Sequence, residues 1–296
     1  MKNKTPYIVI FSIFLGMLII GSFLDFQINS ALFSNTDPIA LFFSAVGEYP
    51  GYGVLAFMGG YLIISSLKFI KKPLPKILLI IGGIISWGSA IYFQGNAITN
   101  INGYNMPQYK WVIGVPIALV ILSPFGIAGI LVARKVKNKN LWQIAFVLAL
   151  ACAIAIGLIN LLKPIMNRPR FRWLITQDEI AFHNWWEPFS GHKNYISSGV
   201  NKDQFKSYPS GHVGTACFML AIPFVPILAE GKITKLSKTI LFSIAGAYAL
   251  FLAFIRMRVG AHFMSDIATG GLISCILHIT ANEIILKLDK RYKFNL

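Results

Sequence analysis

The segment LWQIAFVLALACAIAIGLINLL occupies residues 141–162 and contains no charged side chain. An α-helix needs about 20 consecutive apolar residues to cross the hydrocarbon core of a bilayer, so this run predicts a transmembrane helix. Across the 296 residues, 55% are hydrophobic and 13% are charged, whereas a soluble domain carries about 25% charged residues. The sequence therefore predicts an all-α, polytopic transmembrane helical bundle. It should have about eight spans, because similar apolar runs lie at residues 7–24, 53–70, 77–94, 111–133, 212–229, 239–255 and 263–286.

The charges indicate how the chain is oriented. Most of the 27 Lys and Arg residues lie in alternate loops, whereas the segments 25–52 and 95–110 hold only Lys110. Because cytoplasmic loops are enriched in Lys and Arg, we expect both termini in the cytoplasm and a multi-pass location in the cell membrane. The run at 7–24 follows two lysines and could be a cleaved signal peptide. No small-residue cleavage site follows it, so we expect a retained helix.

Two other interpretations of the composition are disfavoured. The net charge of +16 would suit a nucleic-acid-binding protein, but the cations do not form the basic, aromatic-interleaved patch that binds RNA. We therefore expect no nucleic-acid partner. Cys152, Cys217 and Cys275 all lie inside apolar runs without CxxC spacing, so we expect small buried side chains rather than disulfides or metal ligands.

Three polar stretches interrupt this apolar chain. They are KPIMNRPR at residues 163–170, YPSGH at 208–212 and RMRVGAHFMSD at 256–266. Charged side chains inside or beside a membrane are costly, so by default they mark a functional site. Each stretch adjoins a predicted span, and consecutive spans alternate in direction. We therefore expect the three stretches to meet at the extracytoplasmic face.

The third stretch contains a histidine and a carboxylate with helical spacing. His262 and Asp266 are four residues apart, so both side chains would lie on one face if the chain is helical from Phe263 onward. A carboxylate that accepts from one imidazole nitrogen fixes the tautomer and leaves the other nitrogen as a lone pair. The pair suits a histidine nucleophile or a general base that Asp266 orients. Taken alone, the spacing also fits an incidental histidine at a helix start.

The second stretch predicts an anion-binding turn. Ser210 is a candidate N-cap for the apolar run that follows it, which would place the Gly211 amide at a positively polarised helix end. His212 would lie in the first turn, where it could give a proton to a departing oxygen. A bare capping turn explains the same residues without any chemistry.

Fixed cations complete the set. Lys163 and Arg170 flank Arg168 in the first stretch, and Arg256 and Arg258 lie in the third. A guanidinium grips phosphate oxygens as a bidentate fork, whereas a lysine acts as a point charge. Lys163, Arg170 and Arg256 adjoin the ends of apolar spans on the side that cations usually avoid, so we expect these three to bind phosphate. Outer-surface cations are the alternative explanation.

Together the three stretches resemble the signature of the type 2 phosphatidic acid phosphatase (PAP2) superfamily, which shares its site with vanadium haloperoxidases and glucose-6-phosphatase. That signature reads Lys-x6-Arg-Pro, then Pro-Ser-Gly-His, then Ser-Arg-x5-His-x3-Asp. The blocks 163–170, 209–212 and 256–266 match it in order. Phe171 stands in place of the usual Pro, and Ile255 stands in place of the usual Ser.

The resemblance implies a PAP2-like catalytic domain at residues 141–296, after N-terminal helices at 1–140 to which the motif assigns no role. It implies that His262 attacks phosphorus to form a phosphohistidine, that Asp266 orients His262, and that His212 protonates the leaving oxygen. The phosphate oxygens would be held by Lys163, Arg170, Ser210, the Gly211 amide and Arg256. We expect no metal and no other cofactor, because fixed cations would stabilise the transferring group.

The expected function is therefore hydrolysis of a lipid phosphate or diphosphate by a metal-independent, PAP2-type hydrolase. Undecaprenyl diphosphate, phosphatidic acid and phosphatidylglycerol phosphate are candidate substrates, and membrane lipids are the expected surroundings. Two alternatives stay open: a lipid phosphotransferase with the same site, and a non-catalytic anionic-lipid binder or transporter. The His262–Asp266 pair disfavours the binder, since binding alone needs no oriented imidazole. A vanadate-dependent peroxidase is disfavoured because those relatives are typically soluble.

Two outer segments give weaker expectations. The segment 171–208 is polar and rich in aromatic residues, and such rings favour the lipid headgroup level. We expect it to lie along the outer membrane surface. The apolar run at 39–46 is too short to span and is expected to be interfacial.

Overall fold

The computed structural model describes residues 5–101, 104–177 and 179–294. In this part of the chain, eight helical segments are long and apolar enough to cross a membrane, which confirms the predicted polytopic bundle. The long helices are α1 (Thr5–Leu32), α3 (Tyr49–Phe69), α4 (Pro73–Ile98), α5 (Val115–Lys135), α6 (Trp142–Met166), α11 (Lys235–Arg258) and α12 (Met264–Tyr292). The sixth apolar segment is built from α9 (Gly211–Ala216), a 3-10 helix η4 (Cys217–Phe224) and α10 (Val225–Leu228).

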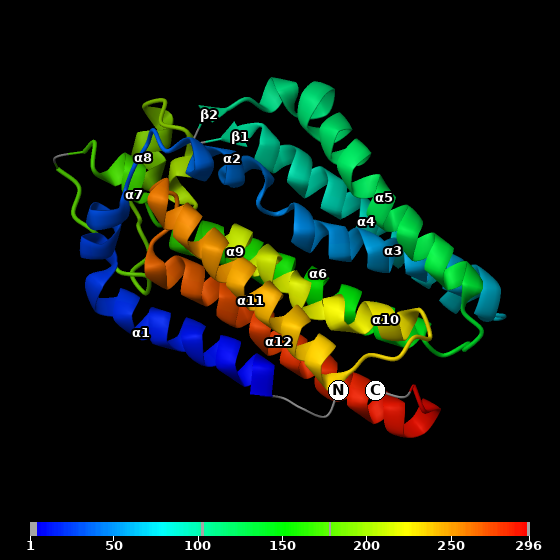
Figure 1. Ribbon diagram of the computed structural model, residues 1–296. Coiled ribbons are helices and arrows are strands. Elements are labelled where there is room, and N and C mark those ends of the chain that lie inside the picture. The colour runs from blue at the N-terminus through cyan, green and yellow to red at the C-terminus, as the bar shows by residue number, and fades with distance from the viewer. Residues whose placement is uncertain (1–4, 102–103, 178, 295–296) are drawn as a thin grey trace.

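The helices form two groups that meet at a central segment. On one side α3 packs against α4 and α5, and on the other side α1 packs against α12 and α11 (Figure 1). The central segment α9–η4–α10 lies between them and contacts α3, α6, α11 and α12. It is among the most deeply buried of the eight segments. All three cysteines are buried within this bundle, as the sequence predicts.

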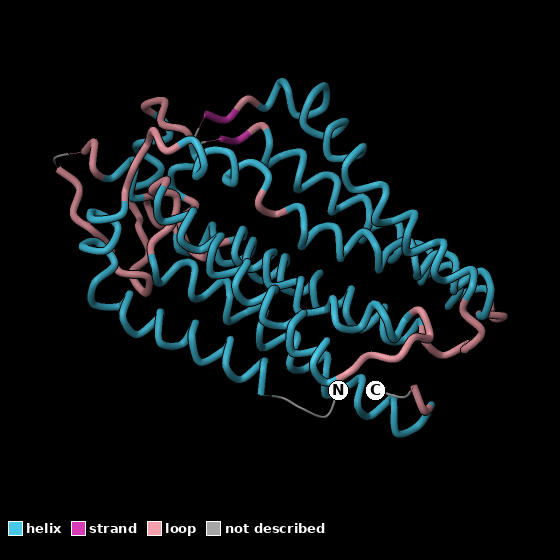
Figure 2. Tube along the Cα trace, in the orientation of Figure 1, coloured by secondary structure: helices cyan, strands magenta, loops and turns pink. Residues whose placement is uncertain are grey.

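The connections differ between the two ends of the bundle. Figure 2 shows the long loops and the only strands drawn gathered at one end, called here the loop-rich end. This end carries α2 (Pro38–Val46), a hairpin of β1 (Asn100–Ile101) and β2 (Tyr104–Asn105), η1 (Pro107–Tyr109), the π-helical turn η2 (Lys110–Gly114), α7 (Phe171–Leu174), α8 (His192–Ser197) and η3 (Lys202–Phe205). The start of α1 and the end of α12 lie at the opposite end (Figure 1).

Local sequence signals explain where the site helices start and stop. Asp37 caps α2 by accepting from the amides of Ile39 and Ala40, and Pro38 follows it at the first helical position. The central segment tightens into η4, which contains Pro223. A proline removes a backbone donor from the regular helical ladder and so favours such an irregular stretch.

The segment 171–208 has a core of its own, which sequence reasoning did not foresee. Five of its aromatic side chains are less than 9% exposed: Phe171, Trp173, Phe189, Phe205 and Tyr208. The ring centroids of Trp173 and Phe205 are 4.7 Å apart in an edge-to-face arrangement. Aromatic pairs of this kind add about 0.5–1.5 kcal/mol beyond the burial of their area. The segment is therefore a packed cap over the bundle.

Candidate active site

A cavity of about 600 Å³ opens at the loop-rich end of the bundle. It gathers Gly211, His212 and His262 on one wall, as the three polar stretches predict. Ser210 and Asp266 lie behind that wall and are fully buried. The charged residues that line the cavity are the cations Lys163, Arg170, Lys202, Lys206 and Arg256, with the carboxylates Glu48 and Asp203. The wall therefore has an excess of positive charge, which suits a polyanionic substrate.

His262 has one ring nitrogen fixed by the protein. Its Nδ1 lies 2.5 Å from the carbonyl oxygen of Ser207. A carbonyl oxygen only accepts, so Nδ1 carries the proton and Nε2 carries the lone pair. The ring is 1% exposed, and its centroid is 6.4 Å from that of His212. This tautomer makes Nε2 of His262 the candidate nucleophile.

Asp266 supports His262 differently from the direct contact that the spacing predicted. Its Oδ2 is 3.9 Å from Nδ1 of His262. That oxygen accepts instead from the Ser207 hydroxyl at 2.5 Å and from the Phe263 amide at 2.8 Å. The physical reason is that α12 begins at Met264, so His262 precedes the helix and does not share a face with Asp266. Asp266 therefore acts through Ser207 and through the cap of α12.

Arg168 points away from the cavity into a buried ionic network. It is 1% exposed, and its Nη1 donates to Asp266 Oδ1 at 2.6 Å and to Ser265 Oγ at 2.8 Å. Its Nη2 donates to Asp25 Oδ2 at 2.9 Å, and its Nε donates to the His183 carbonyl at 3.0 Å. The cation between Lys163 and Arg170 is thus a structural clamp rather than a phosphate ligand.

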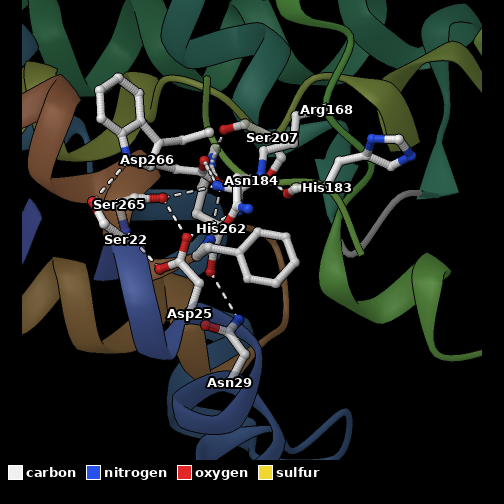
Figure 3. A network of polar contacts seen from close by, with 12 residues as sticks. Ser22, Asp25, Asn29, Arg168, His183, Asn184, Ser207, His262, Ser265 and Asp266 are labelled. Carbon is white, nitrogen blue, oxygen red and sulfur yellow. Dashed lines mark hydrogen bonds and ion pairs between the residues drawn. The ribbon is translucent and has the colours of Figure 1, made fainter. Parts of the chain in front are cut away.

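Helix α1 takes part in this network, although the motif assigns it no role. Asp25 of α1 accepts from the Ser265 amide at 2.9 Å and also from the Ser265 hydroxyl. Asn29, one turn later, donates from Nδ2 to the His262 carbonyl at 3.0 Å. Figure 3 shows Asp25 and Asn29 rising from α1 toward His262, Ser265 and Asp266. The side chains of α1 therefore hold the loop that carries His262 in position.

The Pro-Ser-Gly-His turn leads directly into α9. Ser210 is the N-cap of α9, with its hydroxyl accepting from the Val213 amide at 3.5 Å, as the sequence predicts. The Ser210 amide donates to the Asp266 carbonyl at 2.9 Å, which ties this turn to the start of α12. A Cβ atom built on Gly211 would lie 3.4 Å from Lys163 Nζ. The ammonium of Lys163 therefore sits directly beside the polarised start of α9.

Arg170 and Arg256 place two buried guanidinium groups in the same wall. Nε of Arg170 donates to the Asp203 carbonyl at 2.7 Å, which fixes the group in orientation. Arg256 is 5% exposed, and within the described residues its Nε has no hydrogen-bond partner. A buried, unpaired donor of a cation is costly. An anion in the cavity would relieve that cost, because Arg256 lines the cavity.

Two groups of the site that lie outside the spanning segments have shifted pKa values. Burial, together with the positive charges of Arg170, Arg256 and Lys163, lowers the pKa of His262 well below its usual range. Burial alone would raise the pKa of Asp203, but its hydrogen bond and ion pair with Lys206 bring the pKa below the usual range. His262 is therefore neutral, as a nucleophile must be, while Asp203 is ionised.

The two departures from the PAP2 signature fall on packing positions. Phe171 is 2% exposed, and its ring meets that of Phe263 at 6.0 Å, edge to face. Ile255 is 2% exposed in the core of the bundle. Neither replacement removes a group from the cavity wall.

The sequence model of the PAP2 superfamily matches residues 141–289. The chain belongs to the PAP2 superfamily. PAP2 superfamily members are phosphatases, so at the coarse level this protein is a phosphatase that acts on phosphate-containing substrates. No curated protein and no solved structure matches the chain significantly.

Sequence reasoning missed several polar residues of the PAP2 site. They are Asp25 and Asn29 in α1, Glu48 at the start of α3, and Ser207 just before the Pro-Ser-Gly-His turn. A signal existed for Asp25, because a carboxylate near the end of an apolar run is costly unless it has a partner. Nothing in the sequence indicates which partner that is.

Proposed function

We propose that this protein hydrolyses a lipid phosphate or diphosphate by way of a phosphohistidine. The observation that carries this proposal is the set of groups around one cavity. It comprises two imidazole rings with centroids 6.4 Å apart, the buried guanidinium groups of Arg170 and Arg256, and the half-buried Lys163. Two histidines can divide the work of nucleophile and acid, while cations hold a phosphoryl group between them. Phosphoryl transfer needs mainly such positioning and charge stabilisation.

In the first step, Nε2 of His262 attacks phosphorus while the phosphorus–oxygen bond to the lipid breaks. The leaving oxygen takes a proton from His212. Lys163, Arg170 and Arg256 neutralise the equatorial oxygens, with the Ser210 hydroxyl and the Gly211 amide at the start of α9. In the second step, His212 accepts a proton from water, the water oxygen attacks phosphorus, and the nitrogen–phosphorus bond breaks to release inorganic phosphate.

The shape of the cavity supports a lipid as the leaving group. Beyond the cations, its wall continues along apolar and aromatic residues of α4 and α6, namely Tyr92, Phe93, Ala97, Ile156 and Ile159. Both helices belong to the apolar segments that are long enough to cross a membrane. A headgroup in the charged part would therefore leave its tails beside the hydrocarbon layer. Undecaprenyl diphosphate, phosphatidic acid and phosphatidylglycerol phosphate all fit this description.

The proposed setting is the cell membrane, with the cavity on the extracytoplasmic side and both termini in the cytoplasm. This orientation follows from the lysines and arginines, which concentrate in the loops at the end opposite the cavity. The proposed partners are the lipid phosphate and the surrounding membrane lipids.

The test is a panel of these three lipids, incubated in EDTA with the purified full-length protein. We expect inorganic phosphate in solution, and we expect His262→Ala to abolish turnover because no covalent intermediate can form. His278→Leu is the matched control, because His278 is a buried imidazole of α12 that does not line the cavity. Near-native turnover by His262→Ala would refute the nucleophile assignment. Phosphate release that depends on added Mg²⁺, or transfer to another lipid instead of release, would refute a metal-independent hydrolase.

A further inference from the structure

Glu48 is a buried carboxyl group in the cavity wall to which the proposed steps give no task. It is 6% exposed and sits at the N-cap position of α3, outside the stretch that the PAP2 model matches. Its Oε2 lies 3.6 Å from Nε2 of His212. The same ring nitrogen lies 3.0 Å from the carbonyl oxygen of Ser44. His212 is therefore in contact with the turn that joins α2 to α3.

This turn is held in place from three sides. Besides His212 of α9, Gln94 of α4 donates from Nε2 to the Ala45 carbonyl at 2.8 Å. Tyr248 of α11 donates its hydroxyl to the Gly47 carbonyl at 2.7 Å. Three helices of the bundle, α4, α9 and α11, thus hold the backbone that leads into Glu48. A carboxylate placed in this way keeps its position relative to His212.

A close approach of two helices brings Glu48 to the cavity. A Cβ atom on Gly51 would lie 2.0 Å from the carbonyl oxygen of Thr215, which leaves room for glycine alone. Gly51 is one turn from Glu48 in α3, and Thr215 is one turn from His212 in α9. The Thr215 side chain also hydrogen bonds to the Glu48 carboxyl. The backbone contact therefore sets the Glu48–His212 distance.

The hydrogen bond to Ser44 determines which nitrogen of His212 can serve the substrate. A carbonyl oxygen only accepts, so Nε2 carries a proton and Nδ1 is the nitrogen left for the leaving oxygen. To protonate that oxygen through Nδ1, the ring must hold a proton on both nitrogens and carry a positive charge.

The other charges that face His212 oppose this protonated form. They are the cations Lys163 from the end of α6, Arg170 at the N-cap of α7 and Arg256 from α11, with the His262 ring across the cavity. Facing Glu48 itself are Arg256, Lys163 and the phenols of Tyr52 and Tyr248. Of the two carboxylates that line the cavity, Glu48 is the one in contact with His212, whereas Asp203 is paired with Lys206. A negative charge beside Nε2–H favours the imidazolium.

We propose that Glu48 is a positioning residue that orients His212 and stabilises its protonated form, so that Nδ1 can deliver a proton to the leaving oxygen. This inference rests on the proposed function. Glu48 transfers no proton itself: the proton passes from Nδ1 to the leaving oxygen, and water later returns one to Nδ1. The N-terminal part of the chain then completes the site of the matched part.

The test compares Glu48→Gln with the wild type on two monoesters that differ in their need for an acid. An alkyl ester such as a short-chain phosphatidic acid has a poor leaving group, which needs a proton to depart. In p-nitrophenyl phosphate the leaving group is p-nitrophenolate, which departs without a proton. General acid catalysis contributes about 10²–10⁴-fold. Loss of the carboxylate that supports the acid His212 should therefore lower kcat for the alkyl ester about 10-fold to 100-fold. For the aryl ester we expect less than about a threefold change. Glu187→Gln, which changes an exposed acid of the outer segment, is the matched control.

Two further readouts separate this role from a merely structural one. The alkaline limb of the kcat profile should move to lower pH in Glu48→Gln, since the imidazolium has lost its partner, and Glu48→Asp should partly restore it. In the background of His212→Ala, Glu48→Gln should cause no further loss on the alkyl ester.

Equal losses on both esters, or multiplied losses in the double variant, would overturn the role of Glu48 while leaving the phosphatase intact. An unshifted alkaline limb would overturn it as well. If the wild type hydrolysed neither ester, the proposed function itself would fall, and the role of Glu48 with it.

Discussion

Replacement of Arg168 by Lys should weaken the protein far more than a change between two cations usually does. The guanidinium of Arg168 makes four hydrogen bonds in a fully buried position, to Asp25, His183, Ser265 and Asp266. Its planar fork reaches the two carboxylates from two different nitrogens. An ammonium is a single point, so a lysine can satisfy one carboxylate but leaves the other without its cation.

The expected magnitude follows from that geometry. Hydrogen bonds to charged groups contribute about 1.5–3 kcal/mol each, and breaking one buried ion pair costs about 3–5 kcal/mol. Asp25 and Asp266 are 2% and 0% exposed, so solvent does little to compensate the carboxylate that is left unpaired. We therefore expect Arg168→Lys to lower the free energy of unfolding by about 3–5 kcal/mol.

The assay is unfolding in mixed detergent micelles as the SDS fraction rises, followed by turnover at permissive conditions. Arg134→Lys is the matched control, because Arg134 is an exposed cation in the last turn of α5. Turnover of Arg168→Lys should fall equally on alkyl and aryl esters, since Asp266 and the His262 loop both lose their support. A change of less than about 1 kcal/mol in the free energy of unfolding would refute the clamp role of Arg168.

Four further outcomes are expected. The pKa of His262 is lowered, so its ring stays neutral on mild acidification. The acid limb of kcat/KM should therefore lie below pH 6.5, the ordinary imidazole pKa. An acid limb at or above that pH would contradict the buried setting of His262. Gly51→Ala should lower turnover and the melting temperature together, because its Cβ collides with the Thr215 carbonyl, and native values for both would refute the close approach. Vanadate, which adopts the five-coordinate shape of the transferring group, should inhibit competitively in EDTA; non-competitive inhibition would place it elsewhere. In intact cells a membrane-impermeant thiol reagent should label a cysteine introduced at Ser198 and miss one at Ser237, both exposed positions, and the reverse pattern would invert the topology.

The sequence was sufficient for the bundle and for the two histidines and three of the cations in the cavity wall. Apolar runs reveal spanning helices because a bilayer sets their length. The Pro-Ser-Gly-His turn could be interpreted because N-capping is local: the hydroxyl of Ser210 and the amide of Val213 are three residues apart. The cations were recognisable because lysine and arginine are rare at that side of a membrane.

The contacts that orient the wall were beyond reach for an equally physical reason. The spacing of His262 and Asp266 suggested direct contact, but an i, i+4 argument holds only when both residues are helical, and α12 begins after His262. The carbonyls of Ser44 and Ser207 orient the two imidazoles, and a backbone oxygen leaves no mark in the sequence. In the sequence, Glu48 is recognisable only as a carboxylate between two apolar runs. Its contact, His212, lies 164 positions further along the chain.

The tie between α1 and the start of α12 also bears on how the protein is assembled. Asn29 and Asp25 find their partners in His262 and Ser265, at separations of 233 and 240 residues. During synthesis, α1 leaves the ribosome long before α12 exists. Asp25 and Asn29 therefore lack their partners until α12 has been made and inserted. Contacts between residues this distant in sequence form late in folding, because the entropy of closing the long loop is lost before the contact stabilises the fold. His262 is therefore set in place only as the bundle closes, and we expect a chain interrupted before α12 to have cations and part of the cavity wall but no phosphatase activity.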